Sequence, residues 1–265
     1  MGDFARYILD EEDILSKMEI VYFMAKKNRA FLDKSIIFKT EIVRMFLNFA
    51  KLDIDKNKVI TAMLLCNCKK VNSAQDVERL HSYAKRGSEF LETLGFDRKF
   101  CKMCEEVNRY SESQPREIES DILEVADQFS GMLLRREDRP GFSSEEALIL
   151  LKERNLKNCD NKFLDLFINF INELEKTELK DIVSISPIKK LVKMYNENDT
   201  VVRFMKEVVL WYEPKVDKVM DKCYNNELTK MLNKVDYTES KRPLFSEETT
   251  RKFIGNINNK LDLNM

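Results

Sequence analysis

Apolar residues recur at spacings of three and four along most of the chain, which is the period of an amphipathic helix. Residues 122–134, ILEVADQFSGMLL, show this spacing on most of their circumference and predict a largely buried helix with Asp127 in its middle. Stretches that alternate apolar and polar residues are nearly absent, so we expect an all-α protein. The predicted helices span 11–30, 37–51, 56–68, 75–95, 98–112, 117–136, 144–154, 160–176, 187–197, 199–233 and 247–261.

Helix-stop and helix-start signals divide this pattern. Ser143, followed by Ser144 and two glutamates, predicts a capping box at the start of a helix. A polar stretch near 177–187, TELKDIVSISP, separates two helical groups. We therefore predict a helical domain over 1–175 and a C-terminal helical extension over 176–265. The extension could be a cap packed on the core or an interaction and dimerisation element.

Charge and hydropathy narrow the functional classes. The 45 basic and 46 acidic residues give a net charge of −1, which favours neither nucleic acid nor an anionic membrane as a partner. No apolar run approaches the roughly 18 residues of a membrane span. The first residues, MGDFARYILDEED, lack the basic and apolar segments of a secretory signal, so a cytoplasmic location is expected.

Two close cysteine pairs raise the question of a metal site. Cys66 with Cys68 and Cys101 with Cys104 could supply four thiolates to zinc. The more favoured interpretation is that they are buried, reduced side chains, because Cys66 ends the apolar run VITAMLLC and Cys104 continues an apolar stripe.

The order EVADQFSGMLLRREDRPGFSSEEALILLKE around Asp127 carries a family resemblance. Upstream, MLLCNCKK at 63–70 and KRGSEFLETLGF at 85–96 occur in the matching order, and VNRYSE follows at 107–112. Over about residues 15–175 the chain resembles the HD-GYP branch of the HD phosphohydrolase superfamily. The resemblance implies an HD-type helical bundle and a bacterial signalling role. It also implies a site where family members hold two or three metal ions and hydrolyse cyclic di-GMP.

The metal-binding positions of that family are mostly replaced here. The resemblance aligns its ligands with Phe38, Cys66, Asn67, Tyr83, Tyr110, Ser111 and Asp127. Only Asp127 keeps a family ligand, and the Gly-Tyr-Pro loop is missing. A different alignment could return His81, the only histidine, to the site, but too few ligands would still converge to activate water. We expect no cofactor and no metal.

These observations predict a catalytically inactive HD-GYP-like protein that acts as a regulatory or protein-interaction module, with a homodimer as one option. The first alternative is a sensor that binds a nucleotide such as cyclic di-GMP without cutting it. An active phosphohydrolase with unusual ligation ranks last. Since a buried carboxylate must be neutralised, we expect Asp127 to pair with Lys70 first and Arg109 second, or these cations to contact a ligand.

Overall fold

The computed structural model describes residues 1–27, 32–70, 77–108, 116–136, 139–158, 161–176 and 186–212. All regular secondary structure in these residues is helical, which confirms the predicted all-α class. None of the described helices is both long and apolar enough to cross a bilayer. The helices are α1 (Asp3–Asp10), α2 (Ile14–Lys27), α3 (Lys34–Ala50), α4 (Lys56–Leu65), α5 (Val77–Thr93), α6 (Arg98–Glu105), α7 (Ile118–Leu133), α8 (Ser144–Asn158), α9 (Leu164–Lys176), α10 (Pro187–Glu197) and α11 (Val201–Tyr212).

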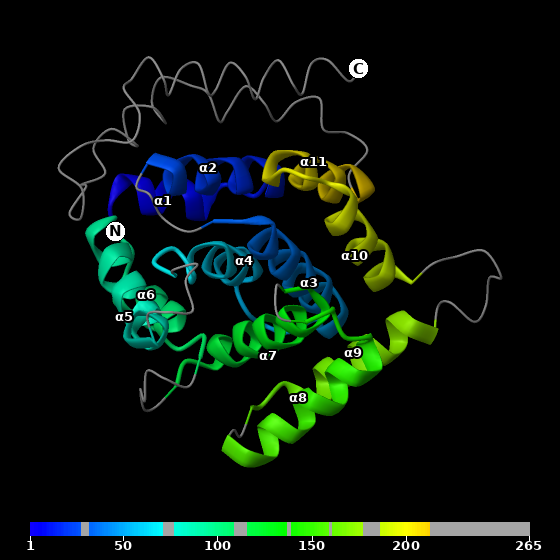
Figure 1. The fold of residues 1–265 in the computed structure, drawn as a ribbon. Coiled ribbons are helices and arrows are strands. Elements are labelled where there is room, and N and C mark those ends of the chain that lie inside the picture. The colour runs from blue at the N-terminus through cyan, green and yellow to red at the C-terminus, as the bar shows by residue number, and fades with distance from the viewer. Residues whose placement is uncertain are drawn as a thin grey trace.

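Helix α3 lies at the centre of the molecule and packs against α4, α7, α9, α10 and α11 (Figure 1). Its sequence, KSIIFKTEIVRMFLNFA, is apolar on several faces, and the run from Ile36 to Val43 is buried throughout. Helices α5 and α6 pack together at one end, whereas α8 and α9 form a layer on the side away from α1 and α2. A helix that is buried all round must be enclosed by others, which explains this arrangement.

Acidic and hydroxyl side chains begin many of these helices. Asp33, Asp55 and Asp97 each accept a hydrogen bond from a first-turn backbone N–H. The capping box predicted at Ser143 is confirmed, because its hydroxyl accepts from the Glu146 N–H and Glu146 accepts from the Ser143 N–H. Such caps satisfy donors that the helix itself leaves unpaired.

The helix predicted over 11–30 corresponds to α2, which begins three residues later than predicted, and α1 was not predicted. Helix α1 ends at Asp10, and α2 begins at Ile14 after a short non-helical segment. Asp13 provides the reason, since its Oδ1 accepts the Ser16 N–H at 2.8 Å and so acts as a helix cap. The acidic run at 10–13 therefore separates two helices. Similarly, α6 ends at Glu105 and not near 112.

Helices α10 and α11 pack on the same core as the rest of the described chain. Phe204 of α11 is fully buried, and its ring meets Tyr195 of α10 edge-on at 5.4 Å between centroids. Lys34 at the start of α3 donates hydrogen bonds to the carbonyl oxygens of Tyr195 and Asn198. The domain boundary at 175 stays a prediction. The helices predicted at 213–233 and 247–261 lie outside the described residues.

The link after α7 is fixed by backbone contacts. The Arg139 guanidinium donates to the carbonyl oxygens of Gly131 and Met132 in the last turn of α7. The Phe142 N–H also donates to Met132 O, at 2.9 Å. A Cβ atom at Gly141 would lie only 2.0 Å from the carbonyl oxygen of Leu133, so this close approach requires glycine.

Candidate functional site

The carboxylate of Asp127 on α7 is paired with Lys39 of α3. The Lys39 Nζ donates to Asp127 Oδ1 at 2.7 Å, and the side chains are 6% and 21% exposed, respectively. The prediction that Lys70 would be the first partner of this carboxylate is therefore wrong. The second predicted partner, Arg109, lies outside the described residues.

Mutual attraction sets the charge state of this pair. Burial alone lowers the pKa of Lys39, but the neighbouring Asp127 more than offsets it, and the net shift is upward. Burial alone raises the pKa of Asp127, but Lys39 and then Lys70 reverse the effect, and the net shift is downward. Both groups are therefore charged at neutral pH.

Lys70 lies near the pair without joining it directly. Its ammonium forms no salt bridge with a described residue and lies 5.5 Å from the ring centroid of Tyr83. Burial, and then the charge of Lys39, lower the pKa of Lys70. The site thus holds a second cation whose charge Asp127 only partly balances.

A third positive charge faces the same region. The Arg136 Nη2 lies 3.5 Å from where a Cβ of Gly131 would be, one helical turn beyond Asp127 on α7. Its charge contributes to the lowered pKa of Lys70. Among the described residues, the cations Lys39, Lys70 and Arg136 outnumber Asp127 and Asp33, the two carboxylates that act on Lys39.

The three predicted positions on α3 and at the end of α4 are part of the core. Phe38 and Asn67 are fully buried and Cys66 is 1% exposed. The Phe38 ring meets Tyr195 of α10 edge-on at 5.8 Å, so an aromatic contact occupies this position. Burial raises the pKa of the Cys66 thiol far above its usual range, which keeps it protonated.

The Asn67 amide is an unsatisfied polar group in this core. It lies near Asp127 and helps to lower the pKa of that carboxylate. Neither amide atom has a hydrogen-bond partner among the described residues. An unpaired buried amide is costly and marks a place where a ligand or water could be held.

Tyr83 is the only other predicted site residue whose side chain is described. It is buried, and its hydroxyl accepts a hydrogen bond from the Asn108 amide at 3.1 Å. Tyr110 and Ser111 lie outside the described residues, as does the side chain of His81.

The residues present do not fit the metal centre that the resemblance implies. The Asp127 carboxylate is already paired with the Lys39 ammonium. Phe38 has no atom that could bind a metal, and the Cys66 thiol stays protonated. Within the described part of the chain, no three histidine, cysteine or carboxylate side chains gather in a way that could hold a metal ion, and this includes the four cysteines considered for zinc.

Lys39 is the functional residue that sequence reasoning missed. A signal was present, because a lysine inside the apolar run SIIFKTEIV requires an anionic partner as much as Asp127 requires a cationic one. Considering both buried charges together would have paired them.

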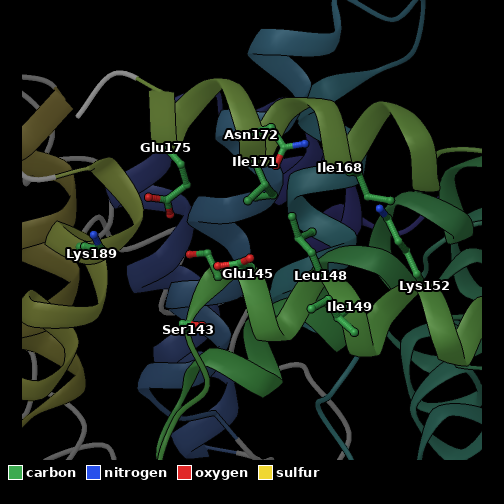
Figure 2. A pocket seen from close by; sticks show the side chains of 11 residues that line it. Ser143, Glu145, Leu148, Ile149, Lys152, Ile168, Ile171, Asn172, Glu175 and Lys189 are labelled. Carbon is green, nitrogen blue, oxygen red and sulfur yellow. The ribbon is translucent and has the colours of Figure 1, made fainter. Parts of the chain in front are cut away.

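A separate groove of about 550 Å³ lies between α8 and α9, away from Asp127 (Figure 2). Its floor is apolar, with Leu148 and Ile171 buried, and charged side chains stand at its ends. No motif in the sequence indicated it.

The comparisons with known proteins identify no relative. No family model, curated protein or solved structure matches the chain.

Proposed function

We propose that this protein is a catalytically inactive HD-GYP-like module with a regulatory or protein-interaction role in the bacterial cytoplasm. The observation that carries the proposal is the Lys39–Asp127 ion pair, in which an ammonium neutralises the one carboxylate kept from the family's ligand set. A divalent cation would have to compete with this ammonium while finding few other ligands.

The test of inactivity is a hydrolysis assay with cyclic di-GMP in the presence of manganese or ferrous ions. We expect no linear product and less than stoichiometric iron, manganese or zinc in the purified protein. An active enzyme with unusual metal ligation would instead release linear product and contain bound metal. Metal-dependent turnover that disappears in Asp127→Ala would overturn the proposal.

A second candidate function is a sensor that binds a nucleotide phosphate without cutting it. It is favoured by the cations Lys39, Lys70 and Arg136, which exceed the carboxylates described around them. It is also favoured by the Asn67 amide, which has no hydrogen-bond partner among the described residues and can donate to a phosphate oxygen. This candidate shares the absence of catalysis with the first and differs in having a ligand.

Calorimetric titration with cyclic di-GMP and with inorganic phosphate separates the two. If the sensor reading holds, Lys70→Met weakens binding about tenfold or more, which corresponds to losing one charged contact. Lys69→Met is the matched control, because the Lys69 ammonium lies 4.3 Å from the Phe90 ring centroid and is directed elsewhere. Absence of heat with either ligand contradicts the sensor candidate and leaves the interaction module.

A further inference from the structure

The groove between α8 and α9 is lined by one stripe from each helix. The α8 stripe has the spacing i, i+3, i+4, i+7, and so does the α9 stripe, which means that each is a single helix face. The stripes are Glu145, Leu148, Ile149 and Lys152 on α8, and Ile168, Ile171, Asn172 and Glu175 on α9.

The two ends of the groove differ in charge. Glu145 and Glu175 point into the same end from opposite walls, and Lys152 lies at the other end beside Ile168 (Figure 2). The acidic end also contains Lys189 of α10, which leaves one net negative charge there among the described lining residues. The Oε1 atom of Glu175 is buried and has no hydrogen-bond partner among the described residues.

The middle of the groove is apolar and partly open to solvent. Leu148 is 8% exposed and Ile171 is fully buried, so they form the floor. Ile149 is 53% exposed and extends this apolar floor to the surface. Covering it would remove apolar surface from water and stabilise a complex.

The α8 stripe is complementary to itself when a second copy runs antiparallel to it. A twofold axis between Leu148 and Ile149 places each of these residues opposite the other in the second copy. The same operation places Glu145 opposite Lys152 of the second copy, and Lys152 opposite its Glu145. Charges of opposite sign thus meet on both sides of an apolar centre, as an isologous interface requires.

We propose that the α8–α9 groove is a homodimer interface in which a second copy of this chain docks antiparallel across Ile149. Two helices from each copy then form a four-helix layer. The inference names one partner for the interaction role proposed above and rests on that role. It uses none of the residues around Asp127.

Sedimentation velocity of the full chain over a wide concentration range tests the interface. We expect a concentration-dependent monomer–dimer equilibrium, and Ile149→Asp should raise the dimer dissociation constant about a hundredfold, because it buries a charge at the centre. A wild-type chain that is monomeric throughout, or a dimer indifferent to Ile149→Asp, overturns the proposal.

A charge exchange distinguishes a second copy from any other occupant. Glu145→Lys and Lys152→Glu alone should each weaken the dimer about tenfold or more, because each replaces two attractive contacts by two repulsive ones. The double variant restores opposite charges across the twofold axis and should recover the wild-type constant. Arg154→Glu is the matched control, because it makes the same charge change as Lys152→Glu on the opposite side of α8, and it should leave the constant unchanged.

Failure of the double variant to recover means that the groove does not pair with itself, and another protein's helix or a small amphipathic ligand becomes the occupant. That outcome overturns the homodimer without affecting the hydrolysis assay. Turnover in the hydrolysis assay overturns the proposed inactivity without affecting the dissociation constants, so the two failures can be told apart.

Discussion

A lysine ammonium held among apolar residues costs free energy that a neighbouring negative group can offset. Asp127 is this group for Lys39, and the two side chains join the centre of α3 to the middle of α7. Each residue is therefore costly to remove singly, because the charge left behind has lost its partner.

A double-mutant cycle measures this coupling. We expect Asp127→Ala to lower the free energy of unfolding by about 3 kcal/mol, the lower end for buried pairs, because Asp127 is partly exposed. Adding Lys39→Met should recover much of this loss, which gives a coupling of about 1.5–3 kcal/mol by urea unfolding. The cycle of Asp127→Ala with Lys70→Met is the control and should be closer to additive. Additivity in the Lys39 cycle would show that the pair does not form.

The pair also predicts a pH window. The pKa of Asp127 is lowered, so its contribution to stability is present above the ordinary value near 3.8 and is lost as pH falls through the folded value. The pKa of Lys39 is raised, so its contribution is complete below 10.5 and is lost as pH rises through the folded value. The difference in stability between wild type and the double variant should therefore be flat between these limits.

Lys17 is a different case, because this buried lysine forms no ion pair with a carboxylate in the described part of the chain. Its side chain is fully buried and donates to Thr61 Oγ1 at 2.6 Å. Burial lowers its pKa to about 8, although Glu11 and Asp55 oppose the shift. At neutral pH the ammonium is still mostly protonated, but its charge is less stable in the folded state than in the unfolded chain.

We expect Lys17→Met to stabilise the protein by about 1–2 kcal/mol at neutral pH, because it removes this desolvation cost. Thr61 keeps its hydrogen bond to Asn57 O. The wild type should gain stability as pH rises from about 8 toward 10.5, so the advantage of the variant shrinks over that range. Denaturant unfolding at about pH 7 and about pH 10 measures both quantities. A variant less stable than wild type at neutral pH would contradict this account.

At the scale of helices, the end of α7 depends on the backbone approach between Gly141 and Leu133. Gly141→Ala places a methyl group against the Leu133 carbonyl oxygen, and we expect a loss of about 1–3 kcal/mol. Gly131→Ala is the matched control inside α7, where the nearest atom to the new Cβ is the flexible end of Arg136 at 3.5 Å. That change should raise stability by about 0.5–1 kcal/mol through helix propensity. Thermal melts in which Gly141→Ala is more stable than Gly131→Ala would contradict the requirement for glycine at position 141.

Helix boundaries were predictable where a capping residue stands at the point where the helical spacing of apolar residues begins. The range 187–197 is reproduced by α10, with Ser186 accepting the Lys189 N–H at its start. Helix α1 was not predicted, and the predicted start at residue 11 precedes that of α2, because an acidic run is compatible with a helix interior and with a helix cap. Asp13 resolves this only through the hydrogen bond it accepts from Ser16.

The candidate site was predictable in part for a related reason. The need for a cation beside Asp127 follows from burial, which the apolar spacing of α7 conveys. The identity of the cation depends on which helices pack together. Family alignment directed attention to Lys70, whereas the packing of α3 on α7 brings Lys39 into contact.

Across the whole molecule, the described helices share one core that includes α10 and α11. Phe204 of α11 is fully buried, and Tyr195 of α10 contacts both Phe204 and Phe38 of α3. Aromatic contacts therefore connect the C-terminal helices to the centre of the bundle.

We expect Phe204→Ala to lower the free energy of unfolding by about 3–5 kcal/mol through the cavity it leaves. If the helices unfold as one unit, a single transition shifts, and amide exchange in α3 accelerates together with exchange in α11. Ile149→Asp, on the exposed groove, is the control and should leave the α3 amides protected in the monomer. Two separate transitions, with only the C-terminal one moved, would support independent folding on either side of residue 175.

The fold protects the thiols of the four cysteines in the described residues. Cys66, Cys68, Cys101 and Cys104 are all free and buried, and burial raises each pKa, to about 12 for Cys68 and Cys101. Because oxidants and alkylating reagents attack the thiolate, these sulfur atoms become reactive only when the helices around them separate. The rate at which these four thiols are alkylated therefore reports how often the helical bundle opens.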